Sequence, residues 1–179
     1  QMKIDAASAK KFVMPRYDME SYKATYGPLL ELAKGVPDTR EMFGSKKKVD
    51  PVGFLIGSAF GWGGLPIEEA YYLNVNPELP VGKYQITVKD VPVEAFWSIS
   101  VYNKEGYFEK NDLDVYSVNN ISGKPNEDGS FTVYLGGCDD GRTNCIPLTE
   151  GWNYAVRLYK PRPEILEGSW VFPSPEPAR

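Results

Sequence analysis

The sequence contains no histidine among its 179 residues. This absence excludes Ser-His-Asp and Cys-His catalytic centres, and it excludes every zinc site that needs an imidazole ligand. Any acid or base catalysis would have to use Asp, Glu, Lys, Tyr or the N-terminal amine. Whether the protein is an enzyme stays open at this point.

An excess of positive charge is also missing. The chain has 20 basic and 24 acidic residues, spread along its length, and a net charge of -4. Because a nucleic-acid backbone is bound through a basic surface, we expect no nucleic-acid partner. The sequence also has no run of about 18 apolar residues, so it predicts no membrane span.

Cysteine is scarce, and both copies lie in one short segment, at Cys138 and Cys145. Gly137 and Gly141 allow the backbone to bend there, and the spacing suits a small loop closed by a disulfide. Such a bond predicts a periplasmic or secreted protein. The alternative is two free thiols in a turn of a cytosolic protein.

The same segment carries three side chains with oxygen ligands for Ca²⁺, namely Asp139, Asp140 and Asn144. Their spacing is not that of an EF-hand loop, and turns rich in Gly and Asp are common without metal. We therefore expect no metal and no other cofactor.

The first third of the chain has helical character. Apolar residues recur at spacings of three and four over residues 18–33, with Gly27-Pro28 in the middle, which predicts two short helices or one kinked helix. Asp50-Pro51 is typical of a helix start, so a helix is expected over residues 51–59. The glycines around Trp62 indicate either a helix stop or a loop that faces a ligand.

From residue 70 onward the pattern changes to a period of two. Strands are expected in six segments: residues 70–75, 83–88, 95–103, 115–119, 131–135 and 152–160. Short, evenly spaced strands separated by Gly, Pro, Asn and Asp indicate a mainly β fold with an antiparallel sandwich or barrel. We divide the chain into a helical extension or connector (1–50), a β-sandwich domain (51–172) and a Pro-rich tail (173–179).

Two of these segments, residues 95–103 and 152–160, have an apolar face and a polar, aromatic face. The apolar faces comprise Ala95, Trp97, Ile99, Val101, Trp152, Tyr154, Val156 and Leu158. The opposite faces comprise Phe96, Ser98, Ser100, Tyr102, Asn153, Ala155, Arg157 and Tyr159. If both strands belong to one sheet, these polar faces form one surface, and Arg157 there needs an anionic partner or water.

Several motifs occur together in order: Phe60-Gly-Trp-Gly-Gly, Phe96-Trp-Ser-Ile-Ser-Val-Tyr-Asn, Gly106-Tyr-Phe-Glu-Lys-Asn, Gly136-Gly-Cys-Asp-Asp-Gly and Gly151-Trp-Asn-Tyr-Ala-Val-Arg-Leu-Tyr. In these motifs the chain resembles the domain of unknown function numbered 1214. That domain is commonly the C-terminal half of bacterial proteins whose N-terminal half is the domain numbered 1254. The resemblance implies a jelly-roll-like β-sandwich preceded by a helical connector. It implies no activity, and the chain is either a short member or a fragment without its companion β-domain.

The candidate ligand-binding residues combine aromatic rings with directional polar groups: Tyr102, Asn103, Tyr107, Glu109, Asn120, Arg157 and Tyr159. This combination is what a sugar or a carboxylate ligand requires. The alternative is that these polar groups only satisfy one another in loops and on the sheet.

Three functions stay open. The preferred one is an exported module that binds a polar small molecule or glycan, or packs in a homo-oligomer. The second is a carbohydrate hydrolase that uses two carboxylates, with Glu105 and Glu109 as candidates beside Asp112 and Asp114, since glycoside hydrolysis needs an acid pair. The third is a purely structural assembly domain.

Overall fold

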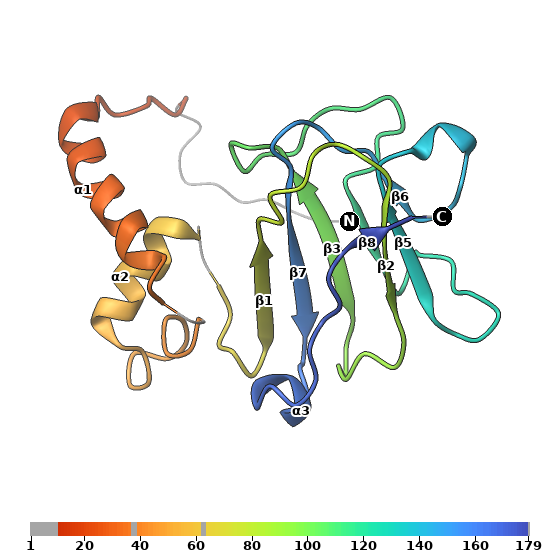
Figure 1. Cartoon of the computed structure of the whole chain (residues 1–179). Helices are drawn as coiled ribbons and strands as arrows, with labels where there is room; N and C mark the ends of the chain where they lie inside the picture. Colours follow the sequence, from red (N-terminus) through yellow and green to blue (C-terminus); the bar gives the residue numbers. More distant parts are fainter. Residues whose placement is uncertain (1–10, 37–38, 62–63, 179) are drawn as a thin grey trace.

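The computed structural model describes residues 11–36, 39–61 and 64–178. It contains a helical pair and two four-stranded sheets, so the fold is mixed α/β and mostly strand. The helical pair comprises α1 (Met19–Ala33) and α2 (Pro51–Phe60). Figure 1 shows the pair beside the outer edge of the first sheet rather than over a sheet face.

The first sheet has the order β1 (Ala70–Val75), β7 (Asn153–Tyr159), β3 (Trp97–Tyr102) and β4 (Ser117–Asn119). The second sheet has the order β6 (Cys145–Ile146), β5 (Phe131–Leu135), β2 (Tyr84–Val88) and β8 (Glu176–Pro177). All strand pairs are antiparallel except β5 with β6, which is parallel. A 3-10 turn, η1 (Cys138–Asp140), and a short helix, α3 (Pro163–Leu166), complete the elements.

Both long helices begin where the sequence predicts. The Asp18 carboxylate accepts hydrogen bonds from the backbone N–H groups of Glu20 and Ser21, each at 3.1 Å, and Asp50 accepts one from Gly53 at 2.6 Å. These bonds satisfy N–H groups that have no partner within the helix. The predicted alternatives for residues 18–33 are resolved as one helix with Pro28 inside it. Trp62 lies outside the described residues, so the two interpretations of its glycine-rich segment stay predictions.

The hydrophobic core lies between the two sheets. Trp97 is 3% exposed and Trp152 is 1% exposed, which confirms the inward face expected for their strands. Ala95, in contrast, is exposed. It precedes β3 and its N–H donates to the Tyr159 carbonyl at 3.3 Å, so the predicted alternation begins only at Phe96. No helix in the described part of the chain is long and apolar enough to cross a membrane.

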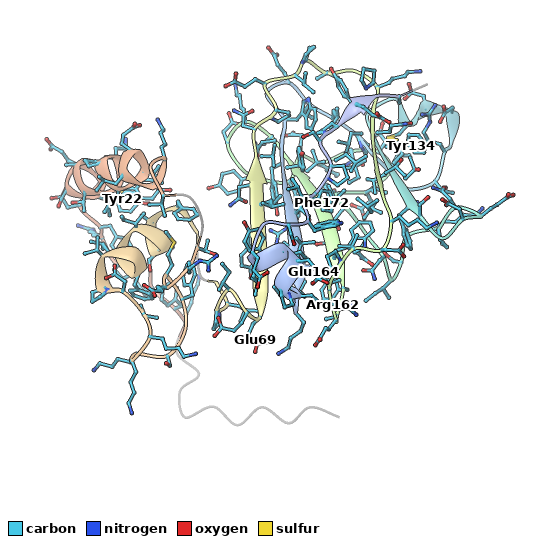
Figure 2. The ribbon with its side chains drawn as sticks, turned by 60° about the horizontal axis from the view of Figure 1, so that its bottom comes forward. Tyr22, Glu69, Tyr134, Arg162, Glu164 and Phe172 are labelled. Atoms are coloured by element: carbon cyan, nitrogen blue, oxygen red, sulfur yellow. A yellow bond between two sulfur atoms is a disulfide. The ribbon has the colours of Figure 1, made fainter. Side chains whose placement is uncertain are left out.

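The C-terminal segment contributes more than a tail. Phe172 is buried in the core and lies over the strands in Figure 2. Beyond it, β8 pairs with β2, and the Gln85 side-chain amide donates to the Glu176 carboxylate at 2.9 Å. Pro177 is tolerated because an edge strand does not need every backbone N–H. The domain boundary at residue 173 stays a prediction, although Glu176 and Pro177 beyond it pair with β2.

Candidate functional site on the first sheet

The outer face of the first sheet is defined here by the side chains of β1, β7, β3 and β4 that point away from the core. They are Ala70, Tyr72, Asn74, Asn153, Ala155, Arg157, Tyr159, Ser98, Ser100, Tyr102, Ser117 and Asn119, and Phe96 adjoins them. Arg157 on β7 lies opposite Tyr72 on β1 and opposite Ser98 on β3. The predicted shared surface of residues 96–102 and 153–159 is therefore present.

Arg157 is the only charged side chain at these strand positions, and it is half-buried. Its guanidinium donates to Ser100 Oγ at 3.1 Å and to the Tyr102 hydroxyl at 2.6 Å. The guanidinium carbon lies 5.9 Å from the centroid of the Tyr102 ring, which is within the range of a cation–π contact. Across the described residues no carboxylate lies within ion-pair distance of Arg157.

Aromatic stacks border the outer face at both ends. Phe96 stacks on Tyr159 with ring centroids 4.3 Å apart, and Tyr102 stacks on Phe108 with centroids 4.9 Å apart. Because a strand rises about 3.3 Å per residue, the six steps from Phe96 to Tyr102 span roughly 20 Å. Small side chains fill the interval, and Ser100 and Ala155 are each 5% exposed.

Tyr72 joins the site from the neighbouring strand β1. Burial raises the pKa of its phenol above the usual value, the nearby Tyr159 raises it further, and the positive charge of Arg157 acts in the opposite direction. Tyr72 is therefore a neutral hydroxyl at physiological pH. Tyr72 is not among the residues predicted from the sequence, because nothing in the sequence places residues 70–75 beside residues 153–159.

Two of the predicted ligand-binding residues, Asn103 and Asn120, have structural partners. The Asn103 side-chain oxygen accepts from the backbone N–H groups of Glu105 at 3.1 Å and Tyr107 at 3.0 Å. The Asn120 side-chain oxygen accepts from the Trp97 backbone N–H at 2.9 Å. These bonds shape a turn and extend a strand pairing. Tyr107 lies in the same turn as Asn103 and is 59% exposed.

The two catalytic candidates lie in this loop, beside the outer face. Glu109 accepts a hydrogen bond of 2.8 Å from the Asn103 side-chain amide, and Glu105 lies 3.7 Å from the Lys104 ammonium. The cavity lined by Glu109 and Tyr102 has a volume of about 20 Å³. This is room for a single water molecule rather than a sugar ring. The carboxylate-dependent reaction stays a prediction.

The segment with the predicted disulfide lies on the second sheet. Cys138 and Cys145 are bonded to each other. Arg142 lies 4.6 Å over the Tyr134 ring and donates to the Asp140 carboxylate at 2.9 Å. The hydrogen bond from Arg142 is the main cause that lowers the pKa of Asp140 from 3.8 to about 2.

The weak Ca²⁺ candidates in that segment have protein partners. Asp140 pairs with Arg142, as above, and the Asn144 side chain donates to the Lys124 carbonyl at 2.8 Å and accepts from the Lys124 N–H at 2.9 Å. Asp139 is exposed on η1. Within the described ranges, no group of three acidic or cysteine side chains is placed to hold a metal ion.

Comparison with known proteins assigns the family. The model for a protein of unknown function, DUF1214, matches residues 74–163. The chain belongs to the DUF1214 family. The matched part of this DUF1214 chain includes Tyr102, Arg157 and both cysteines, whereas Tyr72 lies just before it.

Two solved structures are similar to this DUF1214 chain. The VPA0106 protein from Vibrio parahaemolyticus is 24% identical with a TM-score of 0.68, and the match covers 96% of this chain and 47% of that protein. It shares the fold, and the chain spans about half of its length. An uncharacterized protein from Burkholderia cenocepacia is 23% identical over 51% of this chain and 26% of its own length, with a TM-score of 0.42. No curated protein matches the sequence.

Proposed function

We propose that this DUF1214 chain is an exported β-sandwich module, jelly-roll-like in topology, that binds a polar small molecule or glycan on the outer face of the first sheet. The observation that carries the proposal is the environment of Arg157, a half-buried cation that contacts hydroxyl groups and no carboxylate of the described residues. Partial burial of a charge without a counter-ion costs free energy. A ligand that supplies the counter-charge or further hydrogen bonds offsets this cost.

The aromatic stacks support the same function. Tyr159 and Tyr102 flank the polar centre of the outer face, and each stacks on a phenylalanine. Flat apolar rings beside a small number of directional polar groups are the usual lining of small-molecule sites. The Cys138–Cys145 disulfide supports export, because such bonds persist in oxidising compartments.

The test is a thermal-shift screen of glycans and polar metabolites against the wild type, Arg157→Ala and Arg142→Ala. A ligand that binds only the folded state raises the melting temperature, and the shift grows with the ratio of free ligand concentration to Kd. We expect hits that stabilise the wild type and Arg142→Ala but leave Arg157→Ala unchanged. Arg142 is the matched control, because it also lies over a tyrosine ring but is paired with Asp140. Equal shifts in all three proteins would place binding elsewhere.

A second candidate role, homo-oligomeric assembly, is favoured by the helical pair. α1 has no buried residue, and Tyr22, Phe54 and Leu55 are each more than half exposed. Figure 2 shows Tyr22 on the side of the molecule away from the strands. A hollow of about 320 Å³ lies between the two helices and is lined by Tyr22, Tyr26, Leu29 and Leu55. Contiguous exposed apolar surface is typical of interaction sites.

Light scattering of the whole chain tests this role. Leu55→Asp places a charge in the hollow between the helices, so we expect it to shift an oligomer toward monomer. Val171→Asp is the control, since Val171 is 77% exposed and lies outside the helical pair. A wild-type chain that is monomeric at high micromolar concentration contradicts self-assembly and leaves a companion β-domain as the partner to test.

A further inference from the structure

We infer that the ligand of the outer face is an acidic oligosaccharide, one whose sugar units carry carboxylates. This inference rests on the proposed binding function and specifies its ligand class. It follows from the hydrogen-bond donors around Arg157, from the charges near them and from the length of the face.

The centre of the outer face holds an excess of donors. An arginine has five N–H donors and no acceptor, and two of them are used by Ser100 and Tyr102. Both hydroxyl oxygens therefore act as acceptors toward Arg157, so their own O–H protons are not used in these two bonds. For these two hydroxyls, no acceptor is found among the described residues. Three N–H and two O–H groups are thus left without an acceptor in this part of the protein.

A carboxylate satisfies such a cluster better than a neutral group. Its two oxygens only accept, and they match the planar fork of a guanidinium with two parallel hydrogen bonds. A sugar hydroxyl is also a donor and needs an acceptor for its own O–H, and the groups around Arg157 offer few acceptors. The geometry therefore favours an anionic oxygen pair over Arg157, with the Tyr102 hydroxyl as a further donor, since Ser100 is buried beneath them.

The surrounding charges agree with this assignment. The whole chain has a net charge of -4, yet none of the outward strand positions of the first sheet is acidic. Two acids of the adjacent loop are bonded within that loop: Glu109 accepts from Asn103, and Asp114 accepts from the Tyr116 hydroxyl at 2.8 Å. An anionic ligand at Arg157 therefore meets a locally positive position on an acidic protein.

The size of the face indicates a chain of sugars rather than a single small acid. The aromatic stacks at Phe96 and Tyr102 are roughly 20 Å apart along the strand, with Arg157 and small side chains between them. Rings at both ends can each contact the apolar face of one sugar, while the centre binds the acidic group. A single small carboxylate would occupy only the centre.

The test compares two ligands with the same skeleton by calorimetry: tetragalacturonate and its methyl ester. A hydrogen-bonded charge pair predicts roughly 10- to 100-fold tighter binding of the acid, and this preference should weaken as salt is raised. Arg157→Gln should abolish the preference. Arg157→Lys should retain only part of it, because a lysine keeps the charge but lacks the fork. Tyr102→Phe should weaken binding of the acid while the cation stays in place.

The outcomes separate this inference from the proposed function. Equal affinity for the acid and the ester would overturn the carboxylate assignment and leave glycan binding intact. If citrate bound as tightly as tetragalacturonate, the assignment of the ligand as an oligosaccharide would be overturned. If neither sugar bound and the thermal-shift screen of glycans and polar metabolites gave no hit, the proposed binding function itself would be overturned. Arg142→Gln is the control and should keep the wild-type preference, and circular dichroism of each variant verifies the fold.

Discussion

The outer faces of the two sheets differ in how their hydrogen-bond donors find acceptors. On the second sheet, donors meet acceptors of the same protein: Gln85 donates to Glu176 at 2.9 Å, and the hydroxyls of Thr87 and Thr132 lie 3.0 Å apart. On the first sheet, Arg157 donates to the hydroxyl groups of Ser100 and Tyr102, and its other N–H groups have no acceptor among the described residues. A face whose donors all bond to acceptors of the same protein needs no ligand, whereas a face with surplus donors is stabilised by a ligand that supplies acceptors.

Two arginines show this contrast most directly. Arg142 and Arg157 each lie over a tyrosine ring, at 4.6 Å and 5.9 Å from the ring centroid. Arg142 is neutralised by Asp140, but Arg157 has no carboxylate partner among the described residues. The difference lies in the partner rather than in the ring, and the following predictions test it.

The largest effect is expected where both sheets depend on one side chain. Trp152 is 1% exposed and its ring lies 5.8 Å from that of Tyr84 on the second sheet. Trp152→Ala should lower the free energy of unfolding by about 3–5 kcal/mol, because it leaves a large cavity in the shared core. Denaturant unfolding measures this loss. Tyr107→Ala, at an exposed position, should stay within about 0.5 kcal/mol, and an equal loss there would refute the assigned core.

Removal of the disulfide should affect mainly the second sheet. Replacing Cys138 and Cys145 together by Ser opens a short loop, so the free energy of unfolding should fall by about 2–3 kcal/mol. Melting curves of the wild type with and without reductant give the same comparison. Ligand affinity at Arg157 should be unchanged in the folded double variant. Equal melting temperatures with and without reductant would contradict a structural role of the disulfide.

The two arginines should respond differently to removal of their charge. Arg157→Met should change the free energy of unfolding by less than about 1 kcal/mol, since no ion pair is lost and a half-buried charge is removed. Arg142→Met should be destabilising, because Asp140 loses its partner. Equilibrium unfolding of both variants side by side measures the difference. A larger loss for Arg157→Met would show that Arg157 holds the sheet together.

The smallest effect on stability is expected from protonation of Asp140 at low pH. The pKa of Asp140 is lowered from 3.8 to about 2 in the folded state, so the folded state binds this proton less tightly than the unfolded state does. The stabilising contribution of the Asp140 pair is therefore complete above about pH 4 and is lost as the pH falls toward about 2. Asp140→Asn should remove this part of the acid dependence of the melting temperature. Arg157→Met should leave it unchanged.

The structure confirms some predictions because they depend on local chemistry. The caps at Asp18 and Asp50 follow from a carboxylate next to free N–H groups. The inward position of Trp97 and Trp152 follows from the alternation of an extended backbone. Tyr102 and Arg157 lie on the predicted faces, whereas Asn103 and Asn120 bond to the backbone, and ligand binding by these residues stays a prediction.

The sequence by itself determined the absence of imidazole chemistry, the helix starts and the two faces of the main strands, since each of these depends on residue type or on neighbouring residues. Tertiary structure decided which strands are neighbours. It placed Tyr72 beside Arg157, brought the hydroxyls of Ser100 and Tyr102 within reach of the guanidinium, and paired β8 with β2. These contacts join segments that are far apart in the chain, and packing of the shared core selects their register.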